Sequence, residues 1–184
     1  MKLHRPTKDE LSAATGRTVK DLLAPGLRVL FCGINPSLYS AVVGVHFARP
    51  GNRFWPSLHA SGFTPRRLDP SEQEELLALG LGITNVVDRA TASADLLAPE
   101  ELAEGAKSLA RKVKRHRPRY LAVLGLGAYR TAFARPKARF GPQEETLGDT
   151  RLWVLPNPSG LNASYQLPDL ARLYGELRRA AEAR

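Results

Sequence analysis

Two asparagines in this sequence, Asn35 and Asn157, each lie beside a proline in a turn that follows an apolar, strand-like run. An asparagine side chain offers one carbonyl acceptor and two amide donors, and a neighbouring proline stiffens its loop. Such a pair is suited to binding and orienting a polar ligand. Because ligands of open α/β sheets bind outside the carboxyl ends of parallel strands, we expect the two turns to meet at one site.

Apolar runs are expected to form the strands that position these turns, at residues 27–33, 82–87, 120–125 and 152–156. The first run is apolar almost throughout, as in a parallel strand that is buried on both faces. Helices are expected to begin at the capping box of residues 71–74, at Pro99, after Gly127 and at Pro168. Alternating strands and helices predict an α/β fold with three layers, α/β/α, around a mostly parallel central sheet.

The length of 184 residues fits a single domain, residues 18–184, preceded by a loose polar arm at residues 1–17. No apolar run approaches the roughly 20 residues that span a bilayer, and the amino terminus lacks the apolar segment of a secretory signal. We therefore expect a cytoplasmic, monomeric protein that is not bound to a membrane, and that is associated with the nucleoid if it is bacterial.

Charge is the strongest compositional signal, because the formal net charge is +9 at pH 7. A polyanion releases counterions when it binds such a surface, so nucleic acid is the first candidate partner. The basic stretch at residues 111–119 lies at the end of an expected helix, where cations also suit the helix dipole. Contact with phosphate and simple solvation of that helix are both open for this stretch.

Residue counts and spacings exclude several kinds of cofactor site. Cys32 is the only cysteine, which excludes a disulfide, a Cys-rich zinc site and a four-thiolate iron–sulfur cluster. The four histidines lack paired ligand spacing. Arg130 stands where a dinucleotide-binding turn at residues 125–130 would need its third glycine. We therefore expect no metal, no iron–sulfur cluster and no nucleotide cofactor at this turn.

Four segments follow one another at characteristic spacing: FCGINPS at residues 31–37, FARPGNRFW at 47–55, TNVVDR at 84–89 and LPNPSGL at 155–161. Together they resemble the mismatch-specific uracil/thymine DNA glycosylase family of the uracil-DNA glycosylase superfamily. The resemblance extends from about residue 23 through the last helix. It implies a compact α/β/α domain that flips a base out of double-stranded DNA, cleaves its N-glycosidic bond and leaves an abasic site without a cofactor.

The resemblance also implies roles for individual residues. Asn35 would hold the attacking water, and Phe47 would stack on the flipped base while its backbone N–H helps to read the base edge. The implied base-binding residues are Ile34, Ser37, Phe47 and Asn157. Gly160 and Leu161 would form a wedge that fills the space left in the stack. The expected DNA contacts come from Ser159, Gly160, Leu161 and Asn162, and the Ser159 hydroxyl is also open to a hydrogen bond that stabilises its own turn.

Base excision separates a pyrimidine anion from a sugar that becomes positively charged, so the site must stabilise both charges. Backbone N–H groups or the Asn157 amide can stabilise the anion, whereas Asn35 can orient a water but is a poor proton acceptor. Asp88, at the end of the second strand, is therefore the alternative catalytic residue. Asp88 is also open to an ion pair with Arg89 or another basic side chain. Asp95 is a weaker candidate that suits a turn or cap.

The sequence departs from the pattern of relatives at four positions. Ser37 replaces a glycine in the loop that faces the pyrimidine ring, so we expect uracil to be excised and thymine to be excised more poorly. Asn162 and Ala163 stand where an arginine often follows the wedge, which weakens the expected grip on a guanine opposite the uracil. Asn85 replaces a lysine found near the cleft of some relatives, with no consequence that we can derive.

The leading hypothesis is a monofunctional DNA glycosylase that acts mainly on G:U mismatches in base excision repair, where downstream repair enzymes would process its abasic product. No lysine occupies a matched nucleophile position, which disfavours a strand-cleaving Schiff-base mechanism. The alternatives are a non-enzymatic DNA-binding protein that senses mismatches, and a small-molecule nucleosidase that needs no wedge. Only the first predicts that duplex DNA releases free base and that replacing Asn35 abolishes the release.

Overall fold

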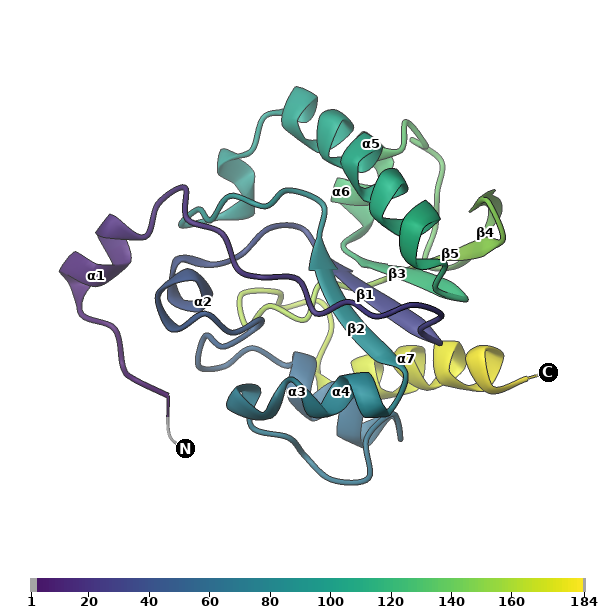
Figure 1. Cartoon of the computed structure of the whole chain (residues 1–184), viewed down its shortest axis with the longest axis horizontal. Coiled ribbons are helices and arrows are strands. Elements are labelled where there is room, and N and C mark those ends of the chain that lie inside the picture. The colour runs from purple at the N-terminus through teal and green to yellow at the C-terminus, as the bar shows by residue number, and fades with distance from the viewer. Residues whose placement is uncertain (1–2, 184) are drawn as a thin grey trace.

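The protein is built on a five-stranded sheet with the strand order β2-β1-β3-β5-β4 (Figure 1), in a computed structural model that describes residues 3–183. The parallel strands are β1 (Val29–Gly33), β2 (Leu81–Asn85), β3 (Tyr120–Leu124) and β5 (Thr150–Leu155). All four overlap the expected apolar runs, and their ends differ from the expected ones by up to two residues. Every position of β1, β2 and β3 is buried, as expected for strands with helices on both sides.

A fifth strand, β4 (Gly141–Leu147), pairs antiparallel with β5 at one edge of the sheet. No apolar run predicted it. Its residues alternate between half-buried and exposed, because one face of this edge strand contacts the core while the other meets water. Its sequence, GPQEETL, is accordingly polar, and β4 makes the sheet mostly rather than wholly parallel.

Helices cover both faces of this sheet and so complete three layers (Figure 1). One face carries α5 (Pro99–His116) and α6 (Leu126–Ala132), and the other carries α3 (Phe54–Ala60) and α7 (Leu167–Glu182). The first core contains Leu109 and Tyr129, and the second contains Phe54 and Tyr174, all of them buried. The expected α/β fold with α/β/α layers is therefore confirmed.

Local capping sets where the helices begin. Helices α5 and α7 have the expected prolines in their first turns. The capping box expected to begin at Ser71 instead joins Asp69 to Glu72, because the Asp69 N–H donates to Glu72 Oε2 at 2.8 Å while Asp69 Oδ1 accepts the N–H and the hydroxyl of Ser71. It opens the short 3-10 helix Pro70–Glu72, and α4 (Glu75–Ala78) follows. A proline suits the first helical position because no N–H is needed there.

Residues 1–17, expected to be a loose arm, contain helix α1 (Lys8–Ala13), which begins with a capping box of its own. Immediately after this helix, Ala14 is fully buried in a small apolar cluster with Ala41 and Ala90. Residues 1 and 2 lie outside the described residues. Ala14 thus anchors the end of this segment to the domain, whereas helix α1 itself has no buried residue.

The basic stretch at residues 111–119 lies at the amino-terminal edge of the parallel strands, because α5 ends at His116 and β3 begins at Tyr120. A hydrogen bond from the Gly26 N–H to the His116 carbonyl, at 2.8 Å, holds this end of the helix beside the start of β1. The two Asn-Pro turns follow the carboxyl ends of β1 and β5. The stretch and the turns therefore lie at opposite edges of the sheet.

Cys32 lies in β1 and is fully buried, and burial raises the pKa of its thiol far above the ordinary value. It therefore belongs to the core rather than to a reactive site. Within residues 3–183, no helix is long and apolar enough to cross a membrane. The same residues contain no group of three or more His, Cys, Asp or Glu side chains placed to hold a metal ion.

Candidate active site

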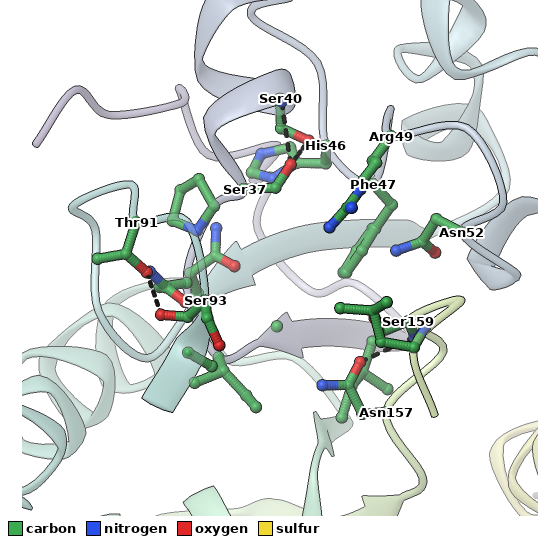
Figure 2. Close-up of a pocket in the computed structure, with 18 of the residues that line it drawn as sticks. Ser37, Ser40, His46, Phe47, Arg49, Asn52, Thr91, Ser93, Asn157 and Ser159 are labelled. Atoms are coloured by element: carbon green, nitrogen blue, oxygen red, sulfur yellow. Dashed lines mark hydrogen bonds between the residues drawn. The ribbon is translucent and has the colours of Figure 1, made fainter. Parts of the chain in front are cut away.

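A cavity of about 370 Å³ opens at the carboxyl ends of β1, β2 and β3, between the two Asn-Pro turns (Figure 2). Most of the residues singled out in the sequence line it: Ile34, Asn35, Ser37, Phe47, Asn157, Ser159, Leu161 and Asn162. Gly160 lies in the same loop as the last of these, whereas Asp88 lies outside the lining. The two turns therefore meet at one site, as the geometry of a parallel sheet predicts.

The Asn35 side chain is held by its amide nitrogen. Nδ2 donates to the Arg89 carbonyl at 3.0 Å and to the Thr91 hydroxyl oxygen at 2.7 Å. The Thr91 hydroxyl in turn donates to the Ser93 carbonyl at 2.7 Å (Figure 2). A parallel bridge between Ser37 and Thr91 brings the two loops together. Since both amide N–H groups are engaged, the carbonyl oxygen is what Asn35 offers to the cavity.

Asn157, in the other turn, offers a hydrogen-bond donor where Asn35 offers an acceptor. Its Oδ1 accepts the N–H of Ser159 at 3.0 Å (Figure 2), which is the geometry of an Asx-turn. Its backbone carbonyl accepts Nδ2 of Asn162 at 3.0 Å. The Asn157 side-chain nitrogen makes no hydrogen bond to any residue in the described range. The cavity therefore has a fixed acceptor in one turn and an available donor in the other.

Phe47 extends into the cavity from the loop before α3 (Figure 2). Its φ of 53° lies in the left-handed region, which costs a non-glycine residue on the order of 1–3 kcal/mol. One face of its ring stacks on Phe54, with centroids 4.1 Å apart and 28° between the planes. Its backbone N–H makes no hydrogen bond to the residues that the structure describes. A stacking surface and an amide donor are thus both available there.

His46, the residue before Phe47, anchors the strained backbone of Phe47. Its Nε2 lies 2.9 Å from the Lys20 carbonyl, so Nε2 carries the proton and donates it. Its backbone N–H donates to Gln73 Oε1 at 3.1 Å, and its carbonyl accepts the Trp55 indole N–H at 3.2 Å. Burial lowers the pKa of the His46 imidazole. His46 is therefore a neutral, multiply anchored support for Phe47.

Close packing explains the glycine at the end of β1. A Cβ on Gly33 would lie 2.5 Å from Oδ1 of Asn85 and 3.2 Å from the Phe47 ring. Asn85 is only 4% exposed, yet it lines the cavity and makes no side-chain hydrogen bond to the described residues. Its amide is therefore available to a ligand. Two signals in the sequence could have indicated this: its place at the carboxyl end of β2, and the lysine that some relatives have there near the cleft.

Ser37 is both a helix cap and a part of the cavity wall. Its hydroxyl oxygen accepts the Ser40 N–H at 3.1 Å at the start of α2 (Leu38–Val43), and its hydroxyl donates to the Ser40 hydroxyl oxygen at 3.1 Å (Figure 2). These bonds hold the side chain in place. Because Ser37 also lines the cavity, it occupies volume that a glycine would leave open.

Asp88 forms the ion pair that was the alternative to a catalytic role. Its side chain is 56% exposed, and Oδ1 lies 3.1 Å from the Lys112 ammonium. Lys112 also lies 2.7 Å from Asp21. Although burial opposes it, hydrogen bonding to Asp21 and the charge of both carboxylates raise the pKa of Lys112. Nothing in this placement brings Asp88 to Asn35, so its catalytic role stays a prediction.

Asp95 does line the cavity, at its exposed rim. It lies in the short 3-10 helix Ala94–Leu96, where Ser93 accepts its N–H as the cap. Arg89, whose carbonyl holds Asn35, is fixed by Glu101, with Nε 2.6 Å from Oε1. Hydrogen bonds from Arg89 and from a backbone N–H lower the pKa of Glu101 to about 2. This ion pair steadies the loop that orients Asn35.

The cavity rim carries an exposed leucine and a cation. Leu161 is 75% exposed, and its N–H donates to the Ser159 hydroxyl oxygen at 3.3 Å. Arg49 is also exposed and lines the cavity close to Phe47 (Figure 2), and it forms no salt bridge within residues 3–183. An exposed apolar side chain and a cation that line the same cavity suit a ligand that has both stacked bases and phosphates.

The chain matches the family model of the uracil DNA glycosylase superfamily over residues 20–178, a range that includes the whole sheet and both Asn-Pro turns. It belongs to this superfamily. Membership indicates a DNA glycosylase, a hydrolase that binds DNA and acts in its repair. The mismatch-specific uracil/thymine branch is a narrower assignment than this match supports.

Three residues that line the cavity had no predicted role: Asn85, Thr91 and Arg49. Thr91 lies 56 residues after Asn35 in the chain, so nothing local links the two. The polar run at residues 91–95, after an apolar strand, is the signal that could have identified Thr91. For Arg49 the signals were its charge and its place in the segment at residues 47–55.

Proposed function

We propose that this protein is a monofunctional DNA glycosylase that flips uracil out of mismatched duplex DNA, mainly from G:U pairs, and hydrolyses its N-glycosidic bond to leave an abasic site. The observation that carries the proposal is a pair of side-chain amides, one in each turn, each of which has only one of its two polar groups hydrogen-bonded within the described part of the protein. Asn35 keeps a carbonyl oxygen for a ligand, and Asn157 keeps an NH₂ group. Hydrolysis needs both polarities, an acceptor for the attacking water and a donor for the departing pyrimidine.

In this mechanism Asn35 Oδ1 accepts a hydrogen bond from the water and aims it at the anomeric carbon of the sugar. An amide oxygen is a poor base, so the water attacks after the glycosidic bond has largely broken. The water then loses a proton, and the departing pyrimidine anion gains one, so the products are the free base and the sugar hydroxyl. Stabilising the pyrimidine anion then contributes most, and Asn157 Nδ2 and the Phe47 N–H are the available donors. No lysine lines the cavity among the described residues, which leaves no amine to form a Schiff base.

Recognition of the base combines stacking with an edge contact. The exposed face of the Phe47 ring would stack on the flipped uracil, an interaction worth about 1–3 kcal/mol. The Asn85 amide has an oxygen and an NH₂ group, so it can pair with N3–H and O4 of the pyrimidine at the same time. Ser37, held in place as the cap of α2, would crowd a methyl group at C5. Uracil is therefore the preferred base and thymine the poorer one.

Mismatch preference follows from the cost of extrusion, which is a few kcal/mol and smallest for a weakly paired base. Leu161, exposed at the rim, would enter the space that the base leaves. Asn162 uses both ends of its side chain within its own loop, bonding to the Asn157 carbonyl and the Ser164 N–H. A side-chain grip on the opposite guanine would break these bonds, so ease of opening contributes most of the selectivity.

The proposal is tested by single-turnover reactions on otherwise identical duplexes that carry G:U, A:U or G:T at one position. Free base is measured by chromatography, and abasic sites are measured as strand breaks that appear only after alkali. We expect free uracil to be released fastest from G:U, with thymine released more slowly. Strand breaks without alkali would contradict a monofunctional mechanism. Tight, salt-sensitive binding without any free base would favour the non-enzymatic mismatch sensor.

A further inference from the structure

The loop that carries Leu161 has few apolar anchors of its own. It connects β5 to α7, and no helix or strand is formed between them. Residues 159–164 are all exposed or half-buried. A surface loop of this kind is mobile unless other parts of the fold hold it. A defined position for Leu161 therefore requires an anchor from another element.

The Arg53 side chain, from the residue before α3, provides this anchor. Its Nη2 donates to the carbonyls of Ser159 at 2.6 Å and Asn162 at 2.5 Å, one on either side of Leu161. Its Nη1 donates to the Tyr165 carbonyl at 2.5 Å. A guanidinium holds its donors in a rigid planar fork. One side chain thus sets the relative positions of three carbonyls.

Backbone contacts dock the two loops in the same place. The Arg53 N–H donates to the Pro158 carbonyl at 2.9 Å. A Cβ on Gly160 would lie 2.7 Å from the Gly51 carbonyl oxygen, which is closer than such atoms approach. Residues 158–165 therefore lie directly against the loop that carries Arg53, and only a glycine fits at position 160 without a shift of the backbone.

The charge of Arg53 is directed at this loop rather than at a carboxylate. Within residues 3–183 it forms no salt bridge, and its Nε is buried without a hydrogen-bond partner. Because a trans peptide is planar, a carbonyl turned inward turns the next N–H outward. Holding the carbonyls of Ser159 and Asn162 therefore turns the N–H groups of Gly160 and Ala163 away from Arg53, toward the exposed side of the loop.

We propose that Arg53 is a positioning residue for base flipping, which holds residues 158–165 in the conformation that presents Leu161 to the DNA stack. The inference rests on the proposed glycosylase function and adds a residue to its flipping step. Arg53 does not line the cavity and so does not touch the base or the sugar. Its loss slows extrusion of uracil from a duplex and spares cleavage of a uracil that is already unstacked.

The kinetic test compares single-turnover uracil release from a G:U duplex and from the same uracil strand without its complement. Arg53→Ala should lose about tenfold or more on the duplex, since a hydrogen bond to a charged group is worth at least that factor. Its rate on the single strand should change little. Arg53→Lys keeps the charge without the fork and should fall between Arg53→Ala and wild type. Equal losses on both substrates would overturn the inference.

Two matched variants sharpen this comparison. Arg172→Ala removes the same charge from an exposed pair with Glu176 on α7, and should behave as wild type on both substrates. Leu161→Ala combined with Arg53→Ala should lose no more on the duplex than Leu161→Ala alone, because Arg53 acts through Leu161. Fully additive losses would show that Arg53 acts elsewhere and would overturn the inference.

Hydrogen exchange of the free protein supplies a readout that needs no activity. In Arg53→Ala the amides of residues 158–165 should exchange faster than in wild type, whereas Arg172→Ala should leave them unchanged. Unchanged exchange in Arg53→Ala would overturn the positioning role. If wild type releases no uracil from any substrate, the proposed function fails, while the exchange result still decides whether Arg53 holds the loop.

Discussion

Replacing Thr91 with valine perturbs the way in which Asn35 is held. Thr91 is buried, accepts the Asn35 Nδ2–H at 2.7 Å and donates to the Ser93 carbonyl at 2.7 Å. Valine has nearly the same shape but can make neither hydrogen bond. The fold should therefore persist while one amide N–H of Asn35 loses its partner, and the amide is then free to turn its oxygen away from the water.

The expected magnitude follows from these two bonds. A hydrogen bond of this kind contributes about 1 kcal/mol net, so losing one or both raises the barrier by about 1–2 kcal/mol. This corresponds to a rate that is about 5- to 30-fold lower, since about 1.4 kcal/mol is a factor of ten. Thr91→Ser retains the hydroxyl and should stay within about threefold of wild type.

The assay is single-turnover uracil release from a G:U duplex with enzyme in excess, so that neither binding nor product release limits the rate. Duplex affinity should be the same for wild type, Thr91→Val and Thr91→Ser. Unfolding should stay cooperative, and the Tm of Thr91→Val should fall by only a few degrees because two hydrogen bonds are lost. In an Asn35→Ala background, Thr91→Val should have no further effect, because the residue that it orients is absent. Equal rates for the valine and serine variants would refute the reasoning.

Other replacements test separate parts of the account. Leu161→Ala should slow duplex cleavage by about 10- to 100-fold, from about 1.5–3 kcal/mol of leucine burial, and should spare single strands; equal losses would exclude a wedge. Ser37→Gly should raise the G:T rate relative to G:U. Asp88→Asn should leave single-turnover rates unchanged, whereas a large fall with an intact fold would make it the base. Because burial lowers the pKa of His46, its unfolded state binds the proton more tightly. The free energy of unfolding, measured in urea, should therefore fall as the pH drops below about 6.5. The fall should be less steep in His46→Gln, and as steep as in wild type in the exposed control His59→Gln.

The layers of this fold were predictable because its parallel strands are buried on both faces. Such strands leave continuous apolar runs in the sequence, as in residues 120–124, where every side chain is buried. Strand β4 (Gly141–Leu147) left no such run, since only alternate residues contact the core. The capping box at Asp69 was missed because Ser71 and Glu74 have the same spacing as Asp69 and Glu72, and sequence alone does not rank the two.

The two asparagines could be found in the sequence because each lies next to its own strand end. The residues that orient them could not all be found in this way. Thr91 and Arg53 act on partners 56 and more than 100 residues away, and only the folded chain brings them into contact. Asp88 illustrates the converse. It follows a strand end as expected, yet its side chain pairs with Lys112 outside the cavity.

The most direct test of the central claim compares wild type with Asn35→Ala in single-turnover uracil release from a G:U duplex. The account predicts that wild type releases free uracil and leaves an alkali-labile site. It also predicts that Asn35→Ala loses nearly all of this rate while duplex affinity and thermal unfolding stay unchanged. Release that survives in Asn35→Ala would contradict the role of Asn35 in orienting the water, and absence of release from wild type would contradict the proposed activity itself.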